Sequence, residues 1–87
     1  MHIFISGFVQ GVGFRYFAWY RAQKLGISGF VRNTEDDCVE IAAEGEEESL
    51  NEFLEIIKQG PGSAVIKKVS ANWLEANGEF SSFRIAY

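Results

Sequence analysis

Two segments with helical periodicity, separated by segments that alternate as strands do, are the feature that most constrains the fold of this chain. In each helical segment, apolar residues recur at the i, i+3 and i+4 spacing that is typical of a helix with one buried face. The first set is Phe14, Phe17, Ala18, Ala22 and Leu25, and the second is Leu50, Phe53, Leu54 and Ile57. Gly26 follows the first set and Gly60 closes the second segment, and helices commonly end at glycine. The sequence therefore predicts two amphipathic helices.

Strands are expected around these helices, because short runs of apolar or alternating residues lie between turn-forming residues. They are expected at residues 2–6, 27–33, 38–45, 65–74 and 83–87. The fourth of them carries three alternating apolar residues on one face, Val69, Ala71 and Trp73. The polar turn 34–37 joins the second and third strands in a hairpin, and a turn at Asn77 and Gly78 precedes the last strand. The order βαββαβ, with a short extra strand, predicts an α+β split βαβ sandwich whose antiparallel sheet carries two helices on one face.

The length and composition fit one domain, spanning residues 1–87, and exclude some kinds of site. Hydrophobic residues make up 47% of the 87 residues, which is enough for a core without disulfides. The single cysteine, Cys38, excludes an internal disulfide and a multi-cysteine metal site. The single histidine, His2, excludes a histidine-rich metal cluster.

The charge and hydropathy patterns limit the partners and the location. The net charge is -4 and Glu46, Glu47 and Glu48 are consecutive, which argues against nucleic acids and membranes as partners, because both favour a basic surface. No apolar run approaches the ~20 residues that span a bilayer, and the N-terminus lacks the features of a signal peptide. We therefore expect a cytoplasmic protein. A small anionic ligand requires that positive potential be concentrated in one site.

A glycine-rich loop between the first strand and the first helix is the main candidate for such a site. Gly7, Gly11 and Gly13 precede Arg15, which falls in the first helical turn. Amides at a helix N-terminus bind oxyanions, glycines let these amides form a concave cradle, and a guanidinium can hold two oxygens. The spacing fits neither a nucleotide P-loop nor a dinucleotide fingerprint, since Tyr16 stands three residues after Gly13. A structural glycine loop with an ordinary surface arginine is the alternative interpretation.

Asn33, at the end of the second strand, is a candidate for the other half of the same site. In a split βαβ fold, the loop after the first strand and the end of the second strand can share one rim. A neutral amide there can hold a water molecule without competing for its proton. Taken alone, Asn33 is better interpreted as the start of the turn, where asparagine is common. Its combination with Arg15 is what favours a shared site.

Two stretches of the sequence resemble the signatures of the acylphosphatase family. They are GFVQGVGFR at residues 7–15 and GFVRN at residues 29–33, and the final FRIAY at residues 83–87 is similar to the end of that family's sequences. The resemblance extends over essentially the whole chain. It implies a ferredoxin-like α/β sandwich that hydrolyses small acyl phosphates to a carboxylate and inorganic phosphate, without metal or cofactor. We also expect a monomer.

The same resemblance implies roles for individual residues. Arg15 would bind the phosphate, and Asn33 would orient the attacking water. The cradle would be formed by the backbone amides of Val9, Gln10, Gly11, Val12 and Gly13. Gly7 and Thr34 would support the site.

The sequence departs from the family pattern at three places. Asp37 stands where a glycine is usual in the hairpin turn, and we expect the turn to survive because aspartate tolerates a left-handed backbone. Phe8 occupies a loop position that is frequently basic, so we expect weaker attraction for an anionic substrate. The segment 60–68 lacks an arginine that is common there. None of these departures affects Arg15 or Asn33.

Two other functions are compatible with a split βαβ fold. RNA-binding modules of this fold display aromatic residues on the third strand, whereas residues 38–44 are acidic and contain none, which argues against RNA. A non-catalytic anion-binding or regulatory module is the stronger alternative, because acylphosphatase-like domains also occur inside larger maturation proteins. The presence of both Arg15 and Asn33 favours hydrolysis.

Overall fold

The computed structural model describes residues 1–74 and 78–86, and within them it contains five strands and two helices. In chain order these are β1 (His2–Phe8), α1 (Phe14–Leu25), β2 (Ser28–Asn33), β3 (Val39–Glu44), α2 (Glu47–Gln59), β4 (Val65–Asn72) and β5 (Phe83–Ala86). The predicted βαββαβ order with a short extra strand is confirmed. Gly26 ends α1 in the left-handed conformation, as its position after the last apolar residue indicates.

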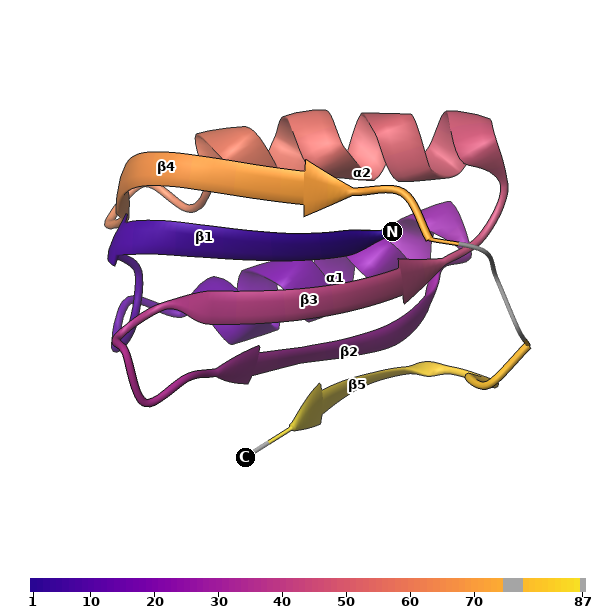
Figure 1. Cartoon of the computed structure of the whole chain (residues 1–87), viewed down its shortest axis with the longest axis horizontal. Helices are drawn as coiled ribbons and strands as arrows, with labels where there is room; N and C mark the ends of the chain where they lie inside the picture. Colours follow the sequence, from indigo (N-terminus) through magenta and orange to yellow (C-terminus); the bar gives the residue numbers. More distant parts are fainter. Residues whose placement is uncertain (75–77, 87) are drawn as a thin grey trace.

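The strands form one sheet in the order β4-β1-β3-β2-β5, which Figure 1 shows from top to bottom. β1 is antiparallel to β4 and β3, and β3 is antiparallel to β2, but β5 runs parallel to β2. The predicted antiparallel pairing is confirmed for β4, β1, β3 and β2, but β5 departs from it, so the sheet is mixed. β4 ends on the side of the molecule where β5 begins, so β5 runs opposite to β4 and in the direction of β2 (Figure 1). The strand order is compatible with a ferredoxin-like fold.

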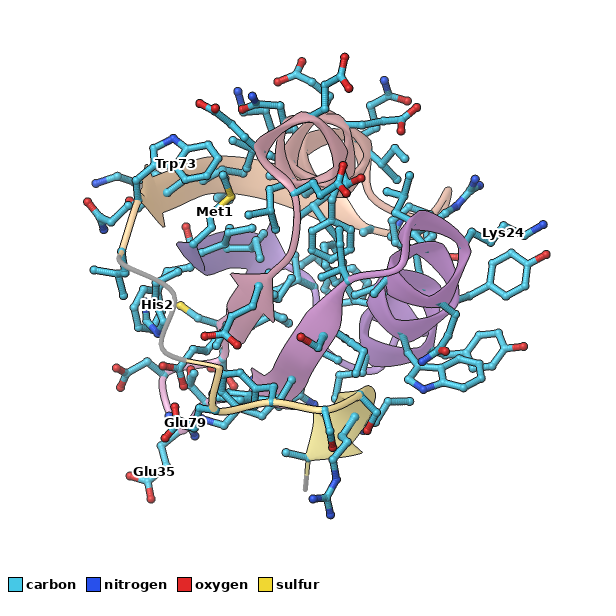
Figure 2. The ribbon with its side chains drawn as sticks, turned by 90° about the vertical axis from the view of Figure 1, so that its right-hand side faces the viewer. Met1, His2, Lys24, Glu35, Trp73 and Glu79 are labelled. Carbon is cyan, nitrogen blue, oxygen red and sulfur yellow. The ribbon has the colours of Figure 1, made fainter. Side chains whose placement is uncertain are left out.

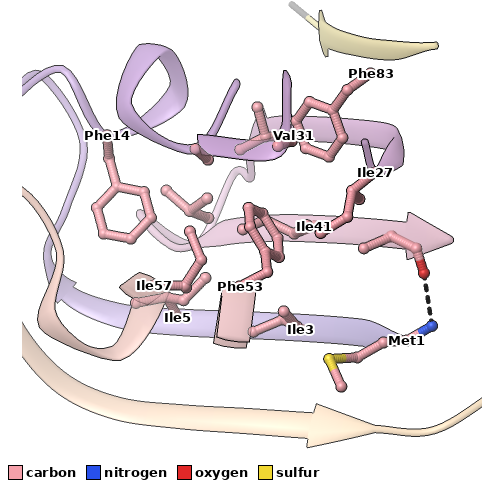
Figure 3. Packing of buried hydrophobic residues seen from close by; sticks show 14 of the residues in the cluster. Met1, Ile3, Ile5, Phe14, Ile27, Val31, Ile41, Phe53, Ile57 and Phe83 are labelled. Atoms are coloured by element: carbon pink, nitrogen blue, oxygen red, sulfur yellow. Dashed lines mark hydrogen bonds between the residues drawn. The ribbon is translucent and has the colours of Figure 1, made fainter. Parts of the chain in front are cut away.

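Both helices cover the same face of the sheet, and the core lies between the two layers (Figures 1 and 2). The alternation in β3 buries Val39, Ile41 and Ala43. The helices bury Phe14, Ala18 and Ala22 from α1, and Leu50, Phe53 and Ile57 from α2. Phe53 meets Phe83 of β5 edge-to-face, with ring centroids 6.0 Å apart (Figure 3). Burial of these apolar side chains is the main source of stability, and it holds α1 at a fixed place on the sheet.

Met1 completes the core at the start of β1. Its side chain is buried, and its amino group donates a hydrogen bond of 2.8 Å to the carbonyl oxygen of Ala43 (Figure 3). Burial lowers the pKa of this amino group, and the carboxylate of Glu44 partly opposes that shift. The strand that leads into the glycine loop is thus fixed from its first residue.

β4 is shorter than predicted. It ends before Trp73, which is exposed and lies at the periphery of the molecule (Figure 2). Ala71 is exposed as well, so of the three alternating apolar residues Val69 packs against the core and the other two do not. β4 is an edge strand with β1 as its only neighbour, and side chains near its end lie beyond the core. The predicted turn residue Asn77 and the final-strand residue Tyr87 lie outside the described residues.

Candidate active site

The loop after β1 and the end of β2 lie on the same side of the molecule, where α1 begins (Figure 1). Gly11 and Gly13 in this loop have φ angles of 75° and 79°, a left-handed conformation that glycine adopts without steric penalty. Gly13 is the N-cap of α1 and offers no side chain to cap the helix. Among the described residues, none accepts a hydrogen bond from the amide of Gly11, Val12 or Gly13. These amides are therefore available to a ligand or to water.

The two helices differ in the charge at their N-terminal ends. α2 carries Glu47 and Glu48 in its first turn, where negative charge offsets the helix dipole. α1 has no acidic residue in its first turn, and Arg15 adds a positive charge there. The start of α1 thus combines the positive end of the helix dipole with a guanidinium, in a chain whose net charge is -4. This is the arrangement that a small anionic ligand requires.

A small pocket brings together the two halves of the predicted site. Arg15 of α1 and Asn33 of β2 both line it, and Gly11 and Gly13 line it from the loop. The other described residues that line it are Val9, Phe14, Tyr16 and Ile85. The pocket volume of about 220 Å³ lies below the ~300–1,000 Å³ of sites that bury drug-sized ligands. The pocket therefore suits a small oxyanion better than a nucleotide.

The five residues predicted to form the cradle are placed in different ways. Val9, Gly11 and Gly13 line the pocket. Val12 packs its side chain against the core, and the side chain of Gln10 points to the β2–β3 hairpin. The binding role of all five backbone amides stays a prediction.

Gln10 connects the glycine loop to the hairpin that follows Asn33. Its side-chain Nε2 donates hydrogen bonds to the main-chain oxygens of Thr34 at 2.9 Å and Cys38 at 2.8 Å. Sequence reasoning missed this contact, because it treated Gln10 only as a backbone donor. A signal was available, since a carboxamide in a loop between the apolar residues Val9 and Val12 needs partners when it is partly buried.

Thr34 closes the hairpin loop directly after Asn33. Its amide donates to the carbonyl oxygen of Cys38 at 2.9 Å, and its hydroxyl oxygen accepts from the Cys38 amide at 3.1 Å. Asp37 in the same loop has a φ of 63°, and no other non-glycine residue in 1–74 and 78–86 has a positive φ. Asp37 therefore adopts the left-handed conformation that the turn requires, as expected for this replacement of the usual glycine. This closed loop gives Asn33 a fixed setting at the end of β2.

Gly7 fixes the point at which the glycine loop leaves the sheet. β1 extends further than predicted, because it pairs with β4 as far as Phe8 through an irregularity between Ser6 and Gly7. Gly7 has a φ of 130°, and a Cβ on it would lie 2.2 Å from the carbonyl oxygen of Val65. Only glycine permits so close an approach of the two strands.

The chemistry of the pocket comes from few polar side chains. Those among its lining residues are Arg15, Tyr16 and Asn33. Over residues 1–74 and 78–86, no three or more His, Cys, Asp or Glu side chains are grouped so that they could hold a metal ion. No helix in that part of the chain is both long enough and apolar enough to cross a membrane.

The fold and the pocket define a class, that of small α+β proteins with a pocket at the start of the first helix. The chain belongs to the acylphosphatase family, whose model matches residues 1–85. It is 45% identical over 85 residues to an acylphosphatase from Caldanaerobacter subterraneus subsp. tengcongensis, and the match covers 98% of this chain and 94% of that one. The resemblance inferred from the two sequence motifs is thereby confirmed. The chain is an enzyme, a hydrolase of acyl phosphates.

Solved structures agree with this assignment. The crystal structure of acylphosphatase from Bacillus subtilis matches with a TM-score of 0.95 and 38% identity, over 99% of this chain and 96% of that one. The chain is also similar to part of full-length HypF, in a crystal structure of its phosphate- and nucleotide-bound form, with a TM-score of 0.91 and 37% identity. That match covers 99% of this chain but 11% of HypF. The same fold thus occurs both as a small protein and within a much larger one.

Proposed function

We propose that this enzyme cleaves the carboxyl–phosphate bond of small acyl phosphates by metal-independent attack of a positioned water molecule. The observation that carries the proposal is the single pocket lined by Arg15, Asn33, Gly11 and Gly13. The phosphoryl group lies between the loop amides and Arg15, which stabilise the charge on its three equatorial oxygens. Asn33 holds the attacking water in line with the bond that breaks.

The side chains that line the pocket suit a reaction with a good leaving group. A carboxylate leaves without a general acid, and no His, Asp or Glu is among the described residues that line the pocket. Water attacks phosphorus, the bond from phosphorus to the carboxylate oxygen breaks, and the proton of the water passes to a phosphoryl oxygen. The products are a carboxylate and inorganic phosphate. No phosphoenzyme forms, because no Ser or Cys stands with Arg15 and Asn33 among those lining residues.

The wider setting of the reaction is part of the same proposal. Residues 1–87 act as one domain and as a monomer in the cytoplasm, without a cofactor and without binding nucleic acid or membranes. The match of the family model to residues 1–85 and the net charge of -4 support this setting. Gel filtration with light scattering tests the monomer.

The decisive experiment measures release of phosphate and benzoate from benzoyl phosphate, in the presence of a chelator, by the wild type and by Asn33→Ala. Rapid hydrolysis that resists the chelator and is lost in the variant is the expected result. Loss of the wild-type activity in chelator, with restoration by a divalent metal, would overturn the metal-independent mechanism. If Asn33→Ala hydrolyses benzoyl phosphate as fast as the wild type, the proposed role of Asn33 in orienting the water is contradicted.

A non-catalytic phosphate-binding module is the second candidate function. The observation that favours it is the similarity to HypF, of which the matching part is only 11%. A folded wild type that binds inorganic phosphate but leaves benzoyl phosphate intact would establish this function in place of hydrolysis.

A further inference from the structure

Tyr16 lines the pocket beside Arg15, yet most of its ring faces solvent. It lies in the first turn of α1, and its side chain is 62% exposed. Two further aromatic residues stand three and four positions later on the same helix face, Trp19 and Tyr20. The ring of Tyr16 stacks on Trp19 with centroids 5.8 Å apart and on Tyr20 with centroids 6.4 Å apart. An exposed aromatic ring is thus held in place at the mouth of the pocket.

Packing of the fold does not account for this ring. Phe14, Phe17 and Trp19 of α1 belong to the core or pack against it, whereas Tyr16 and Tyr20 do not. Tyr16, Trp19 and Tyr20 are stacked together, and a contiguous group of exposed apolar side chains, unlike a single one, often marks a binding site. At the edge of a substrate pocket, the substrate itself can provide that cover.

The size of the pocket indicates which part of the substrate reaches Tyr16. A volume of about 220 Å³ accommodates a phosphoryl group bound by the loop amides and Arg15, but it leaves little space for a bulky acyl group as well. The acyl group must therefore extend to the mouth of the pocket. Among the described residues that line the pocket, Tyr16 is the large hydrophobic residue that is exposed.

We propose that Tyr16 is a specificity-determining residue whose ring stacks on the acyl group and gives preference to flat aromatic acyl phosphates over acetyl phosphate. The proposal rests on the proposed function, because it assumes that the phosphoryl group occupies the pocket. The contact is made with a part of the substrate that does not react. It therefore acts equally on the bound substrate and on the transition state and changes KM more than kcat.

The test compares kcat and KM for benzoyl phosphate and acetyl phosphate in four proteins: wild type, Tyr16→Ala, Tyr16→Phe and Trp73→Ala. Aromatic pairs contribute enough for an expected fall of about threefold to tenfold in the benzoyl-to-acetyl ratio of kcat/KM in Tyr16→Ala. This fall should come from a higher KM for benzoyl phosphate. Tyr16→Phe keeps the ring and should keep the ratio. Trp73→Ala is the control, because it removes an exposed aromatic ring that follows the end of β4 and is not among the described residues that line the pocket.

The other outcomes separate this proposal from the proposed function. If the wild type hydrolyses both substrates and Tyr16→Ala retains the wild-type ratio, the proposed function stands and the role of Tyr16 is overturned. If Tyr16→Phe lowers the ratio as much as Tyr16→Ala, the hydroxyl and not the ring is responsible, and stacking is again overturned. If the wild type hydrolyses neither substrate, the proposed function is contradicted, and the kinetic comparison no longer tests stacking. Calorimetric binding of phenylphosphonate and methylphosphonate then still tests stacking, since the wild type should prefer phenylphosphonate and Tyr16→Ala should not.

Discussion

The side-chain amide of Gln10 lies 2.9 Å from the main-chain oxygen of Thr34, and this hydrogen bond joins the glycine loop to the residue that follows Asn33. The two parts of the candidate site are far apart in sequence, and the shared sheet alone fixes only their general positions. Gln10 adds a direct connection between them, which a second hydrogen bond to the oxygen of Cys38 reinforces.

Replacement of Gln10 by methionine is expected to weaken both the fold and the site. It removes the Gln10 donor from the main-chain oxygen of Thr34, whereas the oxygen of Cys38 keeps its hydrogen bond from the Thr34 amide. The loss of the donor to Thr34 should cost about 1–3 kcal/mol of unfolding free energy. The turnover of benzoyl phosphate should fall as well, because the loop and Asn33 lose their connection. Urea unfolding and steady-state kinetics measure both effects. Gln59→Met, an exposed change at the end of α2, is the control and should change stability by less than about 0.5 kcal/mol.

Arg15 and Asn33 are expected to divide the work of the site. Arg15→Ala should lower turnover at least ~100-fold, as loss of a preorganised donor to a developing oxyanion does, and should weaken inhibition by inorganic phosphate. Arg15→Lys should recover part of the loss, because it restores the charge but not the planar pair of donors. Asn33→Ala should lower turnover and leave phosphate inhibition largely intact. A comparable loss of phosphate binding in the two alanine variants contradicts this division.

Phe8→Lys is expected to strengthen substrate binding. Phe8 is 62% exposed at the start of the glycine loop, so a lysine there adds positive charge near the anion without disturbing the core. KM for benzoyl phosphate should fall a few-fold at low ionic strength, and the gain should shrink above ~0.1 M salt, where the screening length is ~10 Å. Phe4→Lys, an exposed change farther from the loop on β1, is the control. Equal effects of the two lysines would show that only net charge matters.

Asp37→Gly is expected to stabilise the protein. The φ of 63° at Asp37 places a side chain in a backbone region that costs about 1–2 kcal/mol for most residues, and less for aspartate. Glycine removes this strain but loses more backbone entropy on folding, so the net gain should be about 0.5 kcal/mol. Asp36→Gly is the matched control in the same turn, since Asp36 is exposed and has no positive φ. It should lose stability, and an equal gain in both variants would rule out the backbone explanation.

Gly7→Ala is expected to destabilise the protein strongly. The new methyl group would lie 2.2 Å from the carbonyl oxygen of Val65 on a backbone with a φ of 130°, so β1 and β4 must separate. Strain of this kind costs more than about 2 kcal/mol. Gly62→Ala is the control, because nothing lies within 4 Å of its Cβ position and its φ is not in the left-handed region. Thermal unfolding distinguishes them, and similar melting temperatures for the two variants would contradict the clash.

Much of the fold and the candidate site was predictable because both depend on local patterns. The helix from Phe14 to Leu25 has the predicted bounds, since its apolar spacing and the glycine after it are both local signals. The meeting of Arg15 and Asn33 in one pocket followed from the element order together with the two motifs. Their chemical roles stay predictions.

What could not be predicted depends on the arrangement of distant segments. Alternation in residues 83–86 indicates a strand and its faces, but it does not set the direction of the strand, and β5 proved parallel to β2. Likewise, Trp73 continued the alternation of β4 but lies past the end of the strand. The hydrogen bonds of the Gln10 side chain connect two loops that are distant in sequence. No periodic pattern of residues indicates such a contact.

The position of β1 inside the sheet also bears on how this protein is made. β1 lies between β4 and β3, so that His2 pairs with Ala42 on one side and with Asn72 on the other. The glycine loop that follows β1 is synthesised early, but its supporting strand gains both neighbours only when most of the chain has left the ribosome. Sheets built from such distant pairings fold slowly, because long loops must close first. The ability to bind phosphate should therefore arise late and all at once, and a nascent chain that stops before β4 should lack it.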